Sequence, residues 1–270
     1  MSPQRTGASA ALARRRRDDA GSVDEHEFGG TGGATAGSYW QWDLGLGAWR
    51  ARVPSPGLQS TGGVRVDSRQ WDERYSGDEL VWTSTPNQFL VAEVVGLPAG
   101  RAVDLACGEG RNSIWLAEQG WKVTGVDFSP VGLAKAKRFA DLWGVEVTWV
   151  ESAVENWTPP PDGFDLVAVL YLQVPQPARS AALAIAASAV ASGGTLLVVA
   201  HDVDNLIRGH GGPQNPDVLY RVSDVTEAAV EAGLTVERAE QATRVVDTDD
   251  GPRDAVDTVV RAVNVRQRFL

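Results

Sequence analysis

Residues 103–112 read VDLACGEGRN, and residues 123–129 read VTGVDFS. Each stretch starts as an apolar strand; the first runs into a glycine-containing turn and the second ends in Asp127. A nucleoside cofactor that lies over the ends of two neighbouring parallel strands needs a close backbone approach at the first loop and a carboxylate for its ribose at the second. Gly108, Gly110 and Asp127 stand where those needs fall.

The loop itself separates two classes of cofactor. A dinucleotide site has a third glycine and places a pyrophosphate at the helix N-terminus. Here the third position is Ser113, and Glu109 adds a negative charge inside the loop. We expect that charge to repel a pyrophosphate but to accept a cofactor that has no phosphate and carries a positive centre. S-adenosylmethionine (SAM) is such a cofactor.

The long match to DxxCGxGRN, followed at the proper distance by VTGVDxS, resembles the class I SAM-dependent methyltransferases. Residues 107–129 are most similar to the branch that contains the tellurite-resistance and thiopurine methyltransferases, and the resemblance covers roughly residues 71–265. It implies an α/β, Rossmann-like fold with a seven-stranded, mostly parallel sheet in the order 3-2-1-4-5-7-6 and helices on both faces. The alternation of strands and helices along the chain independently predicts a parallel sheet covered on both faces.

The elements can be placed from local signals. Thr85, Pro86 and Gln88 predict a helix start with Thr85 as the N-cap, and the helix should end near Val95. Further helices are expected at 111–119, 131–143 and 224–232, with an alanine-rich helix before Gly193. Strands are expected at 102–106, 122–126, 145–150, 164–170, 195–200, 235–239 and 258–264.

Composition limits the partners and the compartment. The 270 residues carry a formal charge of −10, which argues against a general nucleic-acid surface or an anionic membrane partner. Cys107 is the only cysteine, so no intramolecular disulfide can form. No run of about 18 apolar residues predicts a transmembrane helix, and no apolar stretch follows the basic run at 14–17. We therefore expect a cytoplasmic protein with a small-molecule partner.

Residues 1–63 differ in composition from the rest of the chain. They are rich in Gly, Ala, Ser and Arg and show no sustained apolar period, which predicts a disordered N-terminal extension before a methyltransferase domain at 64–270. Trp40, Trp42 and Trp49 leave two alternatives open: they dock on the domain, or they belong to sequence upstream of the true start.

The resemblance implies a set of cofactor-binding positions along the carboxyl edge of the sheet: Asp104, Ala106, Cys107, Gly108, Gly110, Arg111, Asn112, Asp127, Phe128, Ala153, Val154 and Leu170. Asp104 would meet the amino group of SAM, and Arg111 its carboxylate. Asp127 would accept both ribose hydroxyls. Phe128 would line the adenine. Ala153 replaces the family's acidic contact to the adenine amine, so this contact departs from the pattern.

The methyl acceptor would lie beside the ends of the fourth and fifth strands. Methyl transfer is an in-line displacement, so a base is needed only if the acceptor is protonated. His201, Asp202 and Tyr171 are the candidate catalytic residues, and the histidines show no metal-ligand spacing. Candidate acceptor-binding residues are Trp71, Tyr75, Trp82 and Gln173.

These observations predict a SAM-dependent methyltransferase for a small-molecule, thiol or inorganic acceptor. One alternative is a regulatory protein that binds SAM without turnover. A nicotinamide-dependent oxidoreductase is a more distant alternative, disfavoured by Glu109 and Ser113.

Overall fold

A computed structural model describes residues 39–43, 48–52, 68–77, 80–81 and 85–265. Its helices are α2 (Ser68–Tyr75), α3 (Gln88–Val94), α4 (Arg111–Glu118), α5 (Pro130–Trp143), α6 (Ala178–Ser188), α7 (Asn205–Arg208) and α8 (Val222–Glu231). Its strands are β1 (Tyr39–Asp43), β2 (Ala48–Arg52), β3 (Arg101–Leu105), β4 (Lys122–Asp127), β5 (Val147–Glu151), β6 (Phe164–Leu170), β7 (Val190–His201), β8 (Thr235–Thr248) and β9 (Gly251–Val263). Short 3-10 turns lie at Val154–Asn156 and Pro216–Val218.

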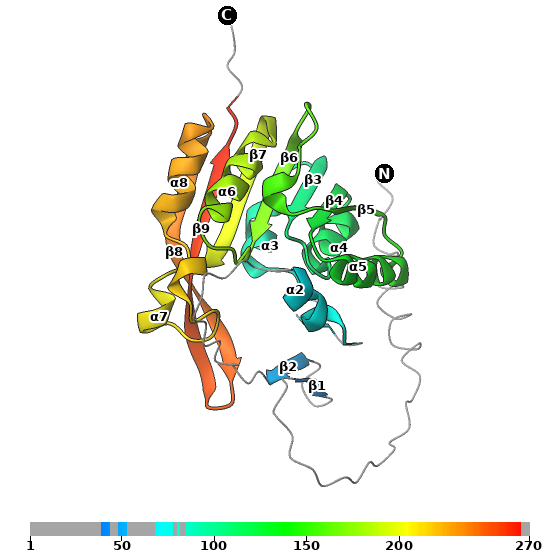
Figure 1. Cartoon of the computed structure of the whole chain (residues 1–270), viewed down its shortest axis with the longest axis vertical. Helices are drawn as coiled ribbons and strands as arrows, with labels where there is room; N and C mark the ends of the chain where they lie inside the picture. Colours follow the sequence, from blue (N-terminus) through cyan, green and yellow to red (C-terminus); the bar gives the residue numbers. More distant parts are fainter. Residues whose placement is uncertain (1–38, 44–47, 53–67, 78–79, 82–84, 266–270) are drawn as a thin grey trace, which may run out of the picture. The chain divides into compact units, whose positions relative to one another are not determined.

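The main sheet has seven strands in the order β5-β4-β3-β6-β7-β9-β8 (Figure 1). Counted in chain order from β3, this is 3-2-1-4-5-7-6, so the predicted fold is confirmed. The first five strands in that order, β5, β4, β3, β6 and β7, run parallel to one another. Strand β9 runs antiparallel to both β7 and β8. The carboxyl ends of the parallel strands consequently meet at one edge of the sheet.

Helices cover both faces of this sheet, as expected. Leu183 of α6 and Val225 of α8 belong to the core on one face, and Leu90 of α3 and Leu116 of α4 belong to the core on the other. Figure 1 shows α6 and α8 on the near side of the sheet. All four of these side chains are buried, so each helix is held by its apolar stripe.

One predicted helix start is wrong. The N-cap of α3 is Asn87 rather than Thr85, because Asn87 Oδ1 accepts hydrogen bonds from the N–H groups of Phe89 and Leu90. The backbone N–H of Asn87 donates in turn to Asn112 Oδ1 at 2.9 Å. A long-range contact to α4 therefore fixes where α3 begins.

The last two strands are much longer than predicted. Strand β8 was expected to end at residue 239 and β9 to begin at 258, but the antiparallel ladder continues to the Thr248–Gly251 pair. This extension places Asp257 on β9 opposite the end of β7, and Arg244 on β8 beside β9. Both residues enter the candidate site described below.

The N-terminal region is described only in part. Strands β1 and β2 form an antiparallel pair in which Trp42 lies opposite Trp49. Residues 1–38, 44–47 and 53–67 fall outside the described residues, so disorder of residues 1–63 and a domain boundary at 64 remain predictions. Within the described residues, no helix is long and apolar enough to cross a membrane.

Candidate active site

The glycine turn after β3 is locked to the end of β4. Gly108 has a positive φ of 55°, and its N–H donates to Asp127 Oδ2 at 2.8 Å. The N–H of Ser129 donates to Asp127 Oδ1 at 2.9 Å. Gly110, also at positive φ, is the N-cap of α4. The two strand ends are therefore joined by one buried carboxylate, as the sequence motif requires.

Asp127 keeps capacity for further hydrogen bonds. Each carboxylate oxygen can accept two, and each receives one from the backbone. Burial raises the pKa of Asp127, while the bonds from Ser129 and Gly108 lower it. A pair of ribose hydroxyls could donate to the remaining lone pairs and add charge-assisted hydrogen bonds.

Asp104 lies at the same edge and is also buried. Ser113 Oγ donates to Asp104 Oδ2 at 2.7 Å. Burial raises the pKa of Asp104 to about 6, although Ser113 and Arg111 act in the opposite direction. Ser113, the residue in the third glycine position, thus holds the acid that should meet an amino group. The serine fits a cofactor with a cationic end.

The structure differs from the prediction that the negative charge of Glu109 in the loop would repel a pyrophosphate. Its Oε1 lies 2.8 Å from Lys135 Nζ of α5, and both side chains are almost fully buried. Both of its carboxylate oxygens also accept from the N–H of Val81. Since Lys135 neutralises Glu109, repulsion of a pyrophosphate by this residue is not what the structure shows. Glu109 instead ties the turn to α5 and to the N-terminal segment.

Helix α2 covers the glycine turn. A Cβ added at Gly108 would meet the Tyr75 hydroxyl at 2.7 Å, and one added at Gly132 would meet the Tyr75 ring at 3.1 Å. Ser129 Oγ donates to Asp72 Oδ1 of α2 at 2.5 Å. Trp71 and Tyr75 pack with ring centroids 5.6 Å apart. Tyr75 is therefore placed at the cofactor turn, while Trp82 lies outside the described residues.

The segment after β5 is predicted to contact the adenine. The N–H of Ser152 donates to the carbonyl of Asp127 at 2.9 Å, which brings Ala153 and Val154 beside the end of β4. Val154 is buried, Phe128 and Ala153 are partly exposed, and Glu155 is exposed. Backbone and apolar side chains thus stand at the predicted adenine edge.

Residues after β6 turn into the site through a strained backbone. Leu170 ends β6, and Tyr171 adopts a positive φ of 59°, which is unusual for a bulky residue. Such strain clusters at functional sites. Gln173 is partly exposed two residues further on.

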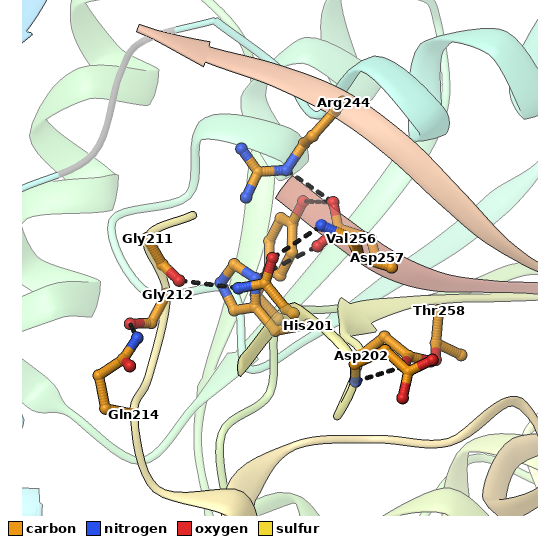
Figure 2. Close-up of polar contacts among 12 residues, drawn as sticks. His201, Asp202, Gly211, Gly212, Gln214, Arg244, Val256, Asp257 and Thr258 are labelled. Atoms are coloured by element: carbon orange, nitrogen blue, oxygen red, sulfur yellow. Dashed lines mark hydrogen bonds and ion pairs between the residues drawn. The ribbon is translucent and has the colours of Figure 1, made fainter. Parts of the chain in front are cut away.

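Tyr171 and His201 are brought together with two residues that the sequence reasoning missed, Arg244 and Asp257. Tyr171 Oη donates to Asp257 Oδ2 at 2.9 Å, and Arg244 Nε donates to the same oxygen at 2.6 Å. His201 Nδ1 lies 3.2 Å from Asp257 Oδ1. Figure 2 shows Arg244 and His201 turned toward Asp257. We call these four residues the acceptor-edge cluster.

Asp202, the third predicted catalytic residue, points elsewhere. It accepts from Thr258 Oγ1 at 2.6 Å and from Gln241 Nε2 at 2.9 Å. Figure 2 shows the Asp202 carboxylate beside Thr258 and apart from His201. Its contacts are those of a residue that fixes the β7–β9 pairing. Among the residues with described placement, no cluster of His, Cys, Asp or Glu has the form of a metal site.

Comparison with known proteins finds methyltransferases. Residues 102–194 match the model of a methyltransferase domain. Glycine N-methyltransferase from Oryctolagus cuniculus is 29% identical over 187 residues, which cover 63% of each chain. A ubiquinone biosynthesis O-methyltransferase from Marinobacter nauticus is 30% identical over 134 residues, covering 48% of this chain and 56% of the relative. Residues 102–194 are therefore similar to the methyltransferase domain, and the strand order of the chain is the one implied by its resemblance to the class I SAM-dependent methyltransferases.

Solved structures support the fold of this methyltransferase. TehB from Haemophilus influenzae matches with a TM-score of 0.55 at 15% identity, over 73% of this chain and 66% of that one. A structure reported for the conversion of a disulfide bond into a thioacetal group during echinomycin biosynthesis matches with a TM-score of 0.59 at 20% identity, over 73% and 93% of the two chains. TehB thus shares the fold. The chain spans only 63% of the length of the rabbit glycine N-methyltransferase.

The match to a methyltransferase domain supports SAM as the cofactor, and the pKa of Asp104 gives a pH dependence for binding it. An acid whose pKa is raised to about 6 is largely ionised at pH 7 and about one-tenth ionised at pH 5. The cationic amino group of SAM should bind the ionised form. We expect SAM affinity to fall roughly tenfold between pH 7 and pH 5.

Calorimetry across this range, with Asp104→Asn as the control, tests the prediction. The variant should bind SAM more weakly than the wild type and show a flatter pH dependence. Equal pH slopes in the two proteins would mean that Asp104 does not hold the amino group.

Proposed function

We propose that this methyltransferase transfers the methyl group of SAM to a small molecule by in-line displacement. Asp127 would hold the ribose hydroxyls, and Gly108 and Gly110 would allow the cofactor to approach the backbone. Asp104 and the carbonyl of Leu170 would receive the amino group, and Arg111 the carboxylate. Phe128, Ala153 and Val154 would surround the adenine.

The observation that carries the proposal is the shared edge of the sheet. The Asp127 turn lies at the ends of β3 and β4, and the acceptor-edge cluster lies at the ends of β6 and β7 and on β8 and β9. A cofactor bound across β3 and β4 would direct its methionine end toward β6. The methyl group would then face the aromatic and basic groups of the cluster.

The acceptor pocket would use the candidate residues unequally. Tyr171 and His201 would contact the acceptor, and Gln173 and Trp71 would line its entrance. Tyr75 would contact the cofactor, because it packs against Gly108. The relatives named above transfer methyl groups to nitrogen and to oxygen, so both kinds of acceptor atom are candidates here.

A methyl-transfer assay tests this function. Protein is incubated with methyl-labelled SAM and a small-molecule extract, and labelled products are separated from unreacted SAM. The proposal predicts labelled product that depends on the protein and disappears in Asp127→Ala. Tight binding of SAM with no labelled product from any extract would instead favour a regulatory protein without turnover.

A further inference from the structure

Asp257 is a buried carboxylate for which cofactor binding gives no role. It has no exposed surface, and the register of β7 and β9 places it directly opposite His201. Burial acts to raise its pKa, but the contacts with His201, Arg244 and Tyr171 outweigh burial and lower the pKa. A buried ionised carboxylate is costly unless it is well compensated, and here three side chains meet it: one from the residue after β6, one from β7 and one from β8.

The imidazole of His201 is confined on both faces. The Tyr171 ring packs on it with centroids 4.6 Å apart. On the loop that follows α7, a Cβ added at Gly212 would lie 3.0 to 3.2 Å from Nδ1, Cε1 and Cγ of the ring. Gly212 also has a positive φ of 74°, which favours glycine. The ring thus packs against the Tyr171 ring and lies close to the backbone of Gly212.

The orientation of the ring selects one nitrogen for chemistry. Nδ1 lies 3.2 Å from the Asp257 carboxylate, so the neutral ring should carry its proton on Nδ1. The free lone pair is then on Nε2. His201 Nδ1 and Asp257 Oδ1 are both buried and neither makes a hydrogen bond within the described part of the chain, so the 3.2 Å contact pairs each with the other. Catalytic hydrogen bonds often form fully only when substrate binds.

Charged and polar groups from several elements surround the Asp257 carboxylate. Arg244 from β8 compensates Asp257 but also lies over the Tyr171 ring, with its guanidinium carbon 5.5 Å from the centroid. The charge of Arg111, from α4, also acts on Tyr171, and the loop after α7 contributes Gly212. Burial and Asp257 raise the pKa of Tyr171, so its hydroxyl stays protonated and serves as a donor. Asp257 is therefore the carboxylate that faces His201.

We propose that His201 is the proton acceptor in methyl transfer, that Asp257 is its positioning residue, and that the methyl acceptor bears a proton on its attacking hydroxyl or thiol. This inference rests on the proposed function and narrows its substrate class. It disfavours inorganic acceptors and other nucleophiles that have no proton to lose.

In the proposed step, X is the attacking oxygen or sulfur of the methyl acceptor. The acceptor X–H gives its proton to Nε2 of His201, and the lone pair left on X forms the X–CH3 bond. The bond between the methyl carbon and the sulfonium breaks, and its electrons stay on sulfur as neutral S-adenosylhomocysteine. The imidazolium, stabilised by Asp257, then releases its proton to water.

An NMR measurement tests the pair without any acceptor. The imidazole nitrogens of His201 are observed in ¹⁵N-labelled protein saturated with S-adenosylhomocysteine, in the wild type and in Asp257→Asn. The proposal predicts a neutral ring with hydrogen on Nδ1 in the wild type and a shift toward Nε2–H in the variant, because the amide would donate to Nδ1. Asp254→Asn, on an exposed part of β9, is the matched control and should match the wild type. Hydrogen on Nε2 in the wild type would overturn the proposal.

A kinetic measurement then tests the acceptor class. Catechol and thiophenol carry the required proton, whereas thioanisole and N,N-dimethylaniline are nucleophiles without it. We expect labelled methyl transfer to a member of the first pair only, with kcat reduced about 100-fold in His201→Gln and in Asp257→Asn. KM for SAM should be unchanged in His201→Gln and Asp257→Asn, which would also show that both variants are folded. The control Asp254→Asn should keep the wild-type kcat.

These outcomes distinguish a failure of the proposed role of Asp257 from a failure of the proposed function. Equal transfer to the proton-free pair, or unchanged kcat in Asp257→Asn, would contradict the role of Asp257. No transfer to any of the four compounds or to the extract would count against the proposed function, and the NMR result would still decide the orientation of His201.

Discussion

Replacing Asp127 with alanine is expected to weaken SAM binding by about 2 to 4 kcal/mol, because the change removes a charged acceptor from two ribose hydroxyls. This corresponds to roughly a 30- to 700-fold rise in Kd. The same carboxylate accepts from the backbone of Gly108 and Ser129, so part of the loss would come from a loosened turn. Calorimetric titration measures the change.

Asp127→Asn separates the two contributions. Asparagine keeps the shape and one strong acceptor, but its amide nitrogen cannot accept from the second N–H. We expect an affinity between those of the wild type and the alanine variant. Wild-type affinity in a folded Asp127→Ala protein would show that the ribose lies elsewhere.

Replacing Glu109 with alanine is expected to lower the free energy of unfolding by about 3 to 5 kcal/mol, because Lys135 would lose its carboxylate partner while still buried. The change would also remove the acceptor of the Val81 N–H. Chemical denaturation monitored by fluorescence measures the loss.

The exposed ion pair of Arg208 and Asp204 provides the control. These residues are four apart on the surface, with nitrogen and oxygen 3.5 Å apart. Asp204→Ala should cost much less stability than Glu109→Ala, because water screens an exposed ion pair. Similar losses at the two sites would mean that Glu109 and Lys135 do not form a buried pair in solution.

The central motif was predictable because its requirements are local. A turn that brings backbone to a ligand needs glycine at Gly108 and Gly110, and a ribose needs a carboxylate such as Asp127 at the end of the next strand. The strand order came from the family resemblance. Periodicity alone distinguishes strands from helices but does not say which strands are neighbours.

The acceptor-edge cluster was only half predictable. Tyr171 and His201 follow strands directly, so their place at the edge can be read from the sequence. Arg244 and Asp257 enter only through the long antiparallel ladder of β8 and β9, whose register no local signal gives. One clue was present: Asp257 interrupts an apolar, buried run on β9, and a buried charge needs a partner.

The pairing of Glu109 with Lys135 was missed for a similar reason. Their charges are 26 positions apart and meet because α5 packs beside the turn. Sequence shows a charge but not what neutralises it, so the expected repulsion of a pyrophosphate by Glu109 was wrong. The exclusion of a dinucleotide now depends on Ser113, which occupies the third glycine position and binds Asp104.

Calorimetric titration of the wild-type protein with SAM, S-adenosylhomocysteine and NAD is the most direct test of whether this sheet edge binds SAM. We expect saturable binding of SAM and S-adenosylhomocysteine at micromolar concentrations and no heat from NAD beyond dilution. Binding of NAD, or the absence of any heat with SAM at millimolar concentration, would contradict the assignment of this sheet edge to SAM.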